Sequence, residues 1–392
     1  MTFSESLQNS LVEGKLEDAL SLLQSRVKEN PTDHEAQLEL IRVTLGLKRF
    51  DEVEKLLQPL LKQKTLMGDV LEIRGLSYQM QGKLKEAKAD FNKALGYSQK
   101  TTSLFYNLGY ILTHQDDFTE EVAILAEKYL KEVLKLDKNH FQAQFELAAL
   151  YTRVNRLPDA ILACQATIEL NPLHVRSYLF LGELFTRAGE IDKVIDLYKA
   201  GLSLNPRVHV FRDEIIRLYK LQGSIEKALN VAIEQTAYRG AYEDYLELGN
   251  LAVQLGQVRV AEIAFLKAEE TKPEDWKAPY NLAELYRGTV ASHEEAEKAY
   301  QRSLKNAENA QSYTGLGLLA LENEEKSDPK IALEHFRRAL DIEFENPTHI
   351  FNLALVLNIL EETDELTKLL NDAKKVIPHE QKILLKIEQM LN

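Results

Sequence analysis

The sequence predicts an all-α protein that folds as an α-solenoid of tandem helix-turn-helix repeats. Three observations lead to this fold class. A small apolar residue recurs about every 34 residues, the segments between carry apolar residues at helical spacing, and glycine or asparagine divides many of these segments in two. Because a pair of helices cannot bury its apolar face alone, such repeats must stack on one another to form a continuous core.

The recurring residue is clearest in residues 245–273, YLELGNLAVQLGQVRVAEIAFLKAEETKP. Here Ala261 stands four residues before Phe265 and seven before Ala268. The same register recurs along the chain, and we call Ala261 and its equivalents the marker positions. They are Ala19, Val53, Ala87, Ala126, Ala160, Val194, Ala228, Ala261, Ala296, Ala332 and Leu366.

Two further series support the repeat. A second small or apolar residue precedes the marker by twelve positions in repeats of standard length, and we call this place the small position. Its residues are Gly75, Ala148, Gly182, Ile216, Gly249 and Ala354. A residue suited to left-handed backbone is expected to end the first helix of each pair. The candidates are Gly14, Gly82, Asn155, Gly189, Gly223 and Gly256.

This pattern resembles the tetratricopeptide repeat family over nearly the whole chain. The best copies are residues 242–273 and residues 178–206, where Tyr178, Gly182 and Tyr198 stand in register. The resemblance implies a right-handed superhelical α-solenoid. It also implies that the first helix of each pair lines a concave groove, where members of the family bind peptides or protein segments.

The repeats predict one continuous solenoid of about eleven units over residues 1–380. The first two are degenerate, with Leu7 and Ile41 at the small position and Pro59 interrupting a second helix. An insertion near residues 113–124 lengthens the fourth repeat and should extend its interhelical turn. Residues 381–392 place apolar side chains at helical spacing and predict a C-terminal capping helix, with an oligomerisation helix as the alternative.

Charge and composition exclude several classes of protein. The formal net charge is −13, from 48 basic and 61 acidic residues, which disfavours binding to nucleic acid. The chain holds no apolar run long enough to insert into a membrane and no signal-like start. The single cysteine, Cys164, rules out an internal disulfide, so the sequence predicts a cytoplasmic protein.

We find no sequence pattern for catalysis, for a cofactor or for a metal site, and the repeats leave no room for a further domain. His114 stands among acidic residues of the insertion, where a solvated turn explains the cluster better than metal binding. Gly315 and Gly317 imitate a dinucleotide fingerprint, but no strand precedes them and packing explains them better. Cys164 is interpreted as a buried apolar residue.

The resemblance also implies a row of groove residues two places before the small position. We take as candidate binding residues Asn107, Glu146, Phe180, Glu214, Glu247, Asn281 and Asn352, together with Asn250. The complete row holds glutamate and asparagine but no lysine or arginine. It therefore favours partners that donate hydrogen bonds, namely basic or extended segments. Surface polarity explains any one of these residues equally well.

One variant of the family clamps a C-terminal carboxylate with basic and amide side chains. Asn250 and Asn281 fit its two amide places, but Leu246, Gln311 and Gly315 stand where the basic residues belong. The clamp is incomplete, so an acidic tail is not the expected ligand.

Three functions follow from the sequence. The first is a non-catalytic adaptor or scaffold that binds peptides or protein segments in the groove. The second is a self-assembling structural protein, because the sequence leaves homo-oligomerisation open. The third is a peptide-sensing regulator, which is disfavoured because such regulators usually carry an effector domain.

Overall fold

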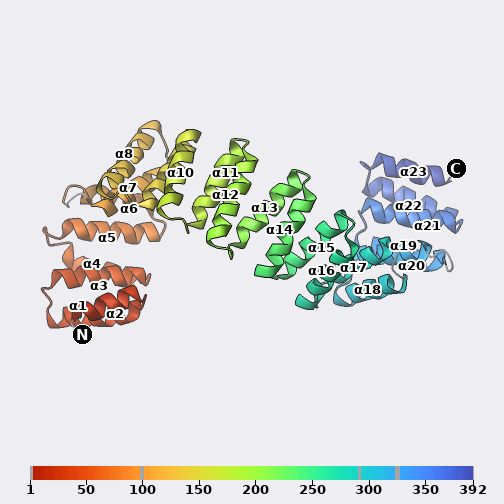
Figure 1. Cartoon of the computed structure of the whole chain (residues 1–392), viewed down its shortest axis with the longest axis horizontal. Helices are drawn as coiled ribbons and strands as arrows, with labels where there is room; N and C mark the ends of the chain where they lie inside the picture. The colour runs from red at the N-terminus through yellow and green to blue at the C-terminus, as the bar shows by residue number, and fades with distance from the viewer. Residues whose placement is uncertain (1–2, 98–100, 290–292, 323–326, 392) are drawn as a thin grey trace. The chain divides into compact units, whose positions relative to one another are not determined.

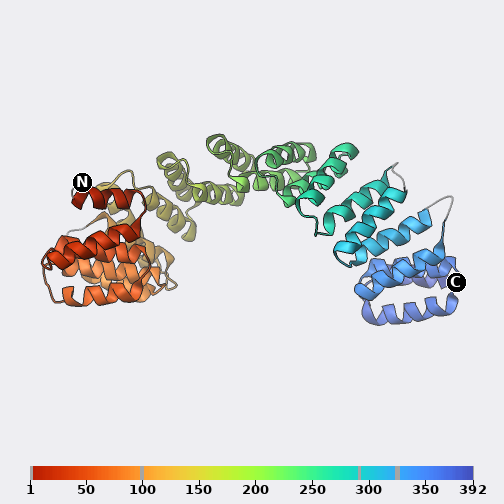
Figure 2. The ribbon, with the colours of Figure 1, turned by 90° about the horizontal axis from the view of Figure 1, so that it is seen from below.

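The computed structural model is all-helical, as the sequence predicts. It describes residues 3–97, 101–289, 293–322 and 327–391, which form 23 helices and contain no strand. The first 22 helices make eleven consecutive pairs, and the two helices of each pair contact one another (Figure 1, Figure 2). The predicted fold class is confirmed.

The helices of a pair are called first and second. The first helices are α1 (Phe3–Val12), α3 (His34–Gly46), α5 (Met67–Met80), α7 (Thr102–His114), α9 (Phe141–Arg153), α11 (Val175–Arg187), α13 (His209–Leu221), α15 (Tyr242–Gln254), α17 (Lys277–Gly288), α19 (Ala310–Glu322) and α21 (Pro347–Ile359). The second helices are α2 (Leu16–Glu29), α4 (Phe50–Leu60), α6 (Leu84–Ala94), α8 (Glu120–Leu136), α10 (Leu157–Leu170), α12 (Ile191–Leu204), α14 (Ile225–Tyr238), α16 (Val258–Thr271), α18 (His293–Asn306), α20 (Pro329–Ile342) and α22 (Thr363–Val376).

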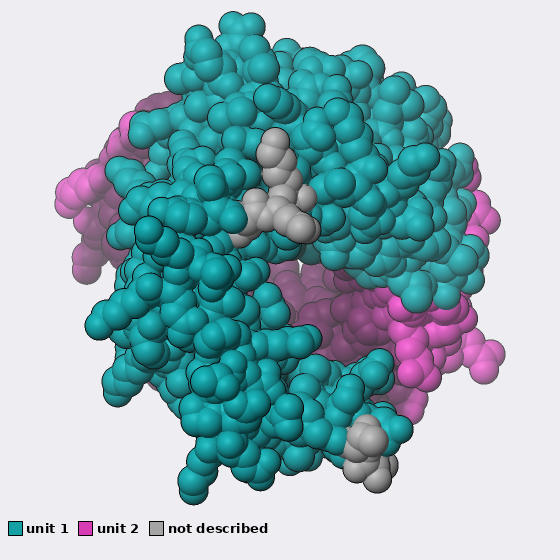
Figure 3. Space-filling model, turned by 90° about the vertical axis from the view of Figure 1, so that its left-hand side faces the viewer, with its two compact units in different colours: residues 1–204 teal, residues 205–392 magenta. Residues whose placement is uncertain are grey.

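The chain divides into two compact units, residues 1–204 and residues 205–392 (Figure 3). Within each unit the second helix of a repeat contacts the first helix of the next repeat, for example α8 with α9 and α14 with α15. The core of each unit therefore runs from one helix pair to the next, as stacking of otherwise unstable pairs requires.

All eleven marker residues are buried in this core and none is more than 2% exposed. They lie on the second helices. Where the first helix has a glycine at the small position, the residue four places after the marker lies against that glycine, as Tyr198 does against Gly182 and Phe265 against Gly249. A Cβ atom added at Gly75 would lie 2.6 Å from Phe91 Cε1, and one added at Gly317 would lie 2.5 Å from Phe336 Cε1. The glycines are needed because an aromatic ring occupies the space that a side chain would fill.

The turn between the two helices uses left-handed backbone, as predicted. Asn155 and the five predicted glycines all have positive φ. Lys48 and Glu361 adopt the same conformation, with φ of 59° and 60°, in repeats where the sequence has no glycine at this place. The backbone of these two residues adopts an unfavourable conformation because the helices on either side fix the turn.

The departures from the repeat pattern have local effects. The helix α4 ends at Leu60, one residue after Pro59, and has 11 residues where α2 has 14. The insertion of the fourth repeat lengthens the segment between α7 and α8, residues 115–119, and also lengthens α8 itself to 17 residues. Part of the insertion is thus helical, because Thr119 caps the extended helix by accepting a hydrogen bond from Val122 N–H.

The last helix, α23 (Gln381–Leu391), contacts α21 and α22. Its Leu384 and Ile387 are buried in the same apolar cluster as α21 and α22. The division of the chain into a repeat region, 1–380, and a cap, 381–392, remains a prediction.

The contact between glycine and aromatic ring predicts the effect of Gly75→Ala. Alanine normally favours a helix over glycine, but here its Cβ would collide with Phe91, so we expect a loss of about 1–3 kcal/mol of stability. Urea unfolding followed by circular dichroism measures the change. The double variant Gly75→Ala with Phe91→Leu should recover part of the loss.

Gly288→Ala is the matched control, because no atom lies within 4 Å of a Cβ built there. An equal loss of stability in Gly75→Ala and Gly288→Ala would show that the Phe91 ring is not the cause.

Candidate interaction surface on the first helices

The candidate binding residues lie on the first helices, but three of them are buried. Asn107 on α7, Glu146 on α9 and Asn352 on α21 are only 5%, 6% and 8% exposed. The remaining candidates are half-buried or, in the last case, exposed: Phe180, Glu214, Glu247, Asn281 and Asn250. The candidates therefore do not form a uniformly accessible row within either unit.

The candidate carboxylates already have partners within the chain. Glu214 accepts from the Arg217 guanidinium at 2.7 Å, and Glu247 accepts from Lys220 Nζ at 2.7 Å. The buried Glu146 lies 2.7 Å from His114 Nε2, and His114 belongs to the acidic cluster that the sequence analysis interpreted as a solvated turn. These pairs offset much of the acidity that the row shows in the sequence.

The two candidate amides at the clamp positions are free. Asn250 on α15 and Asn281 on α17 form no hydrogen bond with the residues that the structure describes. The positions where the clamp would need basic residues have other roles. Gln311 donates to Glu343 Oε1 at 2.9 Å, and Gly315 is buried against the ring of Tyr300. Neither position presents a cation to a carboxylate.

Unit 1 carries an aromatic surface that the sequence analysis largely missed, and we call it the aromatic ladder. Its members are Tyr106, Tyr110, Phe141, Phe145 and Phe180, with His114, His140 and His174. These residues lie on α7, α9 and α11 or cap those helices, and none of them is fully buried.

Neighbouring rings of the ladder contact one another across the helices. Tyr106 lies 5.0 Å from His140, and Phe145 lies 5.4 Å from His174 and 5.6 Å from Phe180, measured between ring centroids. Burial lowers the pKa of His174, with a further contribution from Arg176, so this ring is uncharged at neutral pH. The ladder therefore has apolar ring faces that are not buried in the core of unit 1.

A signal for the ladder existed in the sequence. Tyr106 and Phe145 stand three places before the small position, next to the row that we considered. Only Phe180 belonged to that row. The resemblance to the family directed attention to polar groove positions, whereas large aromatic residues at exposed helix positions carry more binding energy per residue.

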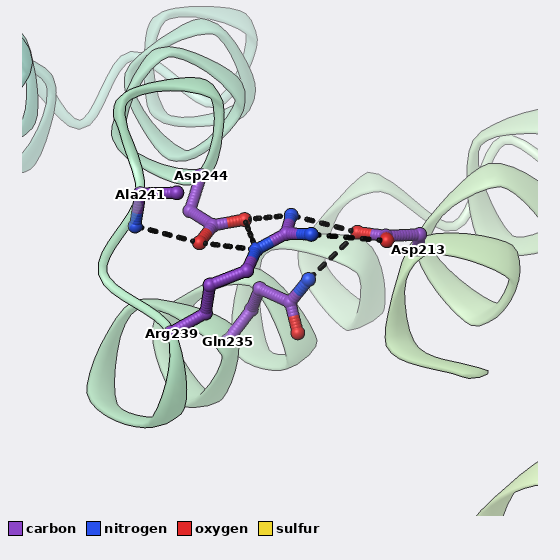
Figure 4. Close-up of polar contacts among 5 residues, drawn as sticks. All are labelled: Asp213, Gln235, Arg239, Ala241 and Asp244. Carbon is purple, nitrogen blue, oxygen red and sulfur yellow. Dashed lines mark hydrogen bonds and ion pairs between the residues drawn. The ribbon is translucent and has the colours of Figure 1, made fainter. Parts of the chain in front are cut away.

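Unit 2 holds a network of charged groups between α13 and α15 (Figure 4). Arg239 follows the end of α14 and binds two carboxylates, Asp244 on α15 and Asp213 on α13. Asp244 also accepts from Ala241 N–H at 2.9 Å, and Gln235 on α14 donates to Asp213 Oδ1 at 2.6 Å. Burial, with repulsion from Asp244, raises the pKa of Asp213 against the opposing effect of Arg239.

This network forms one side of a pocket of about 320 Å³ that opens on the first helices of unit 2. The sequence analysis named one of its residues, Glu247, as a candidate binding residue. The lining consists of Asp213, Ile216, Arg217, Lys220, Ala232, Gln235, Arg239, Glu243, Asp244 and Glu247.

Family models agree with the helix pairs. Models of the tetratricopeptide repeat match residues 11–66, 69–101, 153–207 and 246–310. The chain belongs to the tetratricopeptide repeat family. No curated protein matches it significantly in sequence.

Solved structures with a similar fold include yeast Tom70, which is 13% identical to this tetratricopeptide repeat protein. The match covers 99% of this chain and 94% of Tom70, with a TM-score of 0.42. Cut9, from the APC/C complex Cut9-Hcn1, is 13% identical over 100% of this chain and 96% of its own, with a TM-score of 0.41. YrrB, titled a TPR protein with an unusual peptide-binding site, is 21% identical over 48% of this chain and 94% of its own, with a TM-score of 0.39.

Other sites considered in this tetratricopeptide repeat protein have structural explanations. Gly315 and Gly317 lie against Tyr300 and Phe336, which accounts for their spacing. In the part of the chain that the structure describes, no helix combines the length and apolarity that crossing a membrane requires. Nor do the described residues bring together three or more potential ligand side chains around a metal position.

Cys164 is fully buried on α10, where its thiol donates to Ser177 O at 3.3 Å. Burial raises the pKa of this thiol to about 12, so the thiolate needed for reaction is scarce at neutral pH. The interpretation of Cys164 as a buried apolar residue is confirmed.

We therefore expect the native protein to resist thiol labelling. With Ellman's reagent at about pH 8, labelling of the folded chain should be at least a hundredfold slower, to order of magnitude, than labelling in denaturing urea. The absorbance of the released thiolate measures both rates. Equal rates would contradict the burial of Cys164.

Proposed function

We propose that this protein is a non-catalytic scaffold that binds peptides or protein segments on the face of its first helices, within the concave groove that the family fold implies. The observation that carries the proposal is the aromatic ladder of unit 1. Three successive first helices, α7, α9 and α11, leave tyrosine and phenylalanine rings half-exposed beside one another.

Rings in this position favour a protein partner. Burying an aromatic side chain in an interface removes a large apolar area from water with little loss of side-chain freedom, and such residues dominate the energetics of many interfaces. Tyr106 and Tyr110 also offer hydroxyl groups. Arg176, 5.6 Å from the Phe145 ring centroid, adds a cation at the edge of the ladder. A segment that lies across α7, α9 and α11 would bury these faces together.

The amides of unit 2 fit the same function. Asn250 and Asn281 lie on successive first helices and have both a donor and an acceptor free. An extended segment exposes backbone N–H and C=O groups that such amides can bind. The proposal includes the cytosolic location that the sequence predicts, and basic or extended partner segments.

The test compares two double variants of unit 1 in affinity capture from native lysate, with mass spectrometry as the readout. In Tyr110→Ala/Phe180→Ala the ladder loses two rings, so we expect captured partners to fall at least about tenfold. Leu136→Ala/Leu162→Ala is the matched control, because these leucines are exposed on the second helices α8 and α10. Circular dichroism confirms that both variants are folded.

Partners retained equally by the ladder variant and the control would contradict the proposed surface. Recovery of the protein itself as the main captured species would instead favour self-assembly.

A further inference from the structure

We propose that the pocket between α13 and α15 receives an arginine side chain from the bound segment, which makes the scaffold selective for basic segments. This inference rests on the proposed scaffold function and assigns the chemistry of one place on the first-helix face. The pocket lies wholly within unit 2, and its side walls come from two successive first helices.

The charges that line the pocket do not balance. Four carboxylates, Asp213, Glu243, Asp244 and Glu247, face three cations, Arg217, Lys220 and Arg239. Arg217 is held by Glu214, which lies outside the lining.

Lys220 is held by Glu247. Arg239 binds both Asp213 and Asp244. Because four carboxylates of the lining face three cations, the pocket carries surplus negative charge.

The geometry shows which of the two carboxylates bound by Arg239 is less well compensated. Asp244 has a side chain only 2% exposed, and it receives both Nε and a terminal nitrogen of Arg239 as well as Ala241 N–H. Asp213 has a side chain 46% exposed and lies farther from the same guanidinium, with its nearest contact at 3.2 Å. The hydrogen-bonding capacity of the Asp244 carboxylate is therefore used within the chain. The Asp213 carboxylate remains accessible from the pocket.

A second acceptor lies beside Asp213. Gln235 is 1% exposed, and its amide nitrogen is committed to Asp213, which fixes the orientation of the amide. Gln235 Oε1 accepts no hydrogen bond from the residues that the structure describes. Because a buried acceptor without a donor is costly, this atom leaves the lining of the pocket short of one hydrogen-bond donor.

Glu243 completes the acceptor set at the rim. It is exposed and makes no hydrogen bond or ion pair with the described residues. A guanidinium carries five N–H donors in a planar fork, so one arginine can serve Asp213 and a neighbouring acceptor at once, whereas lysine offers a single ammonium group. A pocket of about 320 Å³ suits one long side chain and is too small for a folded element.

The experiment selects peptides from a phage-displayed random library against the intact protein, followed by affinity measurement on the strongest binders. We expect arginine to be enriched at one position. Replacing that arginine with citrulline, which keeps the shape and removes the charge, should weaken binding at least about tenfold.

The protein variants test whether this pocket is responsible. Asp213→Asn/Glu243→Gln removes two negative charges from the pocket and should weaken the arginine peptide at least about tenfold while leaving the citrulline peptide unchanged. The matched control, Glu226→Gln/Glu274→Gln, removes the same charge outside the pocket lining. The single variant Glu243→Gln breaks no hydrogen bond or ion pair with the described residues, so its smaller loss of affinity tests the pocket even if Asp213→Asn disturbs folding.

Three results would overturn the inference: selected peptides without arginine enrichment, enrichment that persists in the pocket variant, or equal loss in the control variant. None of these affects the proposed scaffold function, because the aromatic ladder is tested separately by capture. A protein whose captured partners depend on Tyr110 and Phe180 but not on Asp213 would be a scaffold without an arginine pocket.

Discussion

The fold depends on the close approach of the two helices within each repeat. Where an aromatic ring from the second helix fills the contact, the first helix must present glycine, as Gly75 does to Phe91 and Gly317 to Phe336. This contact fixes the distance and rotation of the pair, and the buried marker residues then fix the packing of the second helix. Since each helix pair is incomplete alone, the same constraint makes successive repeats stack within each unit.

Because the core takes only one face of each first helix, another face remains for function. In unit 1 this face holds rings that are half-exposed although they contact one another. In unit 2 it holds amides and a charged pocket. The two units thus offer different chemistry on equivalent helices: aromatic area near Phe145 and carboxylate acceptors near Asp213.

Ion pairs neutralise much of the charge of the glutamates that the sequence analysis placed in the groove row. Glu214 and Glu247 are separated from their cations by one helical turn or by one repeat, and both are engaged by Arg217 and Lys220. What the pocket offers a ligand is therefore Asp213, which competes with Asp244 for one guanidinium. A count of acidic residues along the row does not identify it, because the imbalance arises from which pairs form.

The amino-acid sequence by itself determined the repeat architecture, because marker residues such as Ala261 and left-handed turns such as Asn155 are local requirements that recur at a fixed period. It also placed Cys164 in the core. It did not predict the left-handed turns at Lys48 and Glu361, since neither residue type favours positive φ. The tertiary structure alone decided which polar side chains are free, burying Asn107 and Glu146 and leaving Asn250 exposed. The reason is physical: burial and ion pairing depend on contacts between neighbouring repeats, whereas periodicity depends only on spacing within the chain.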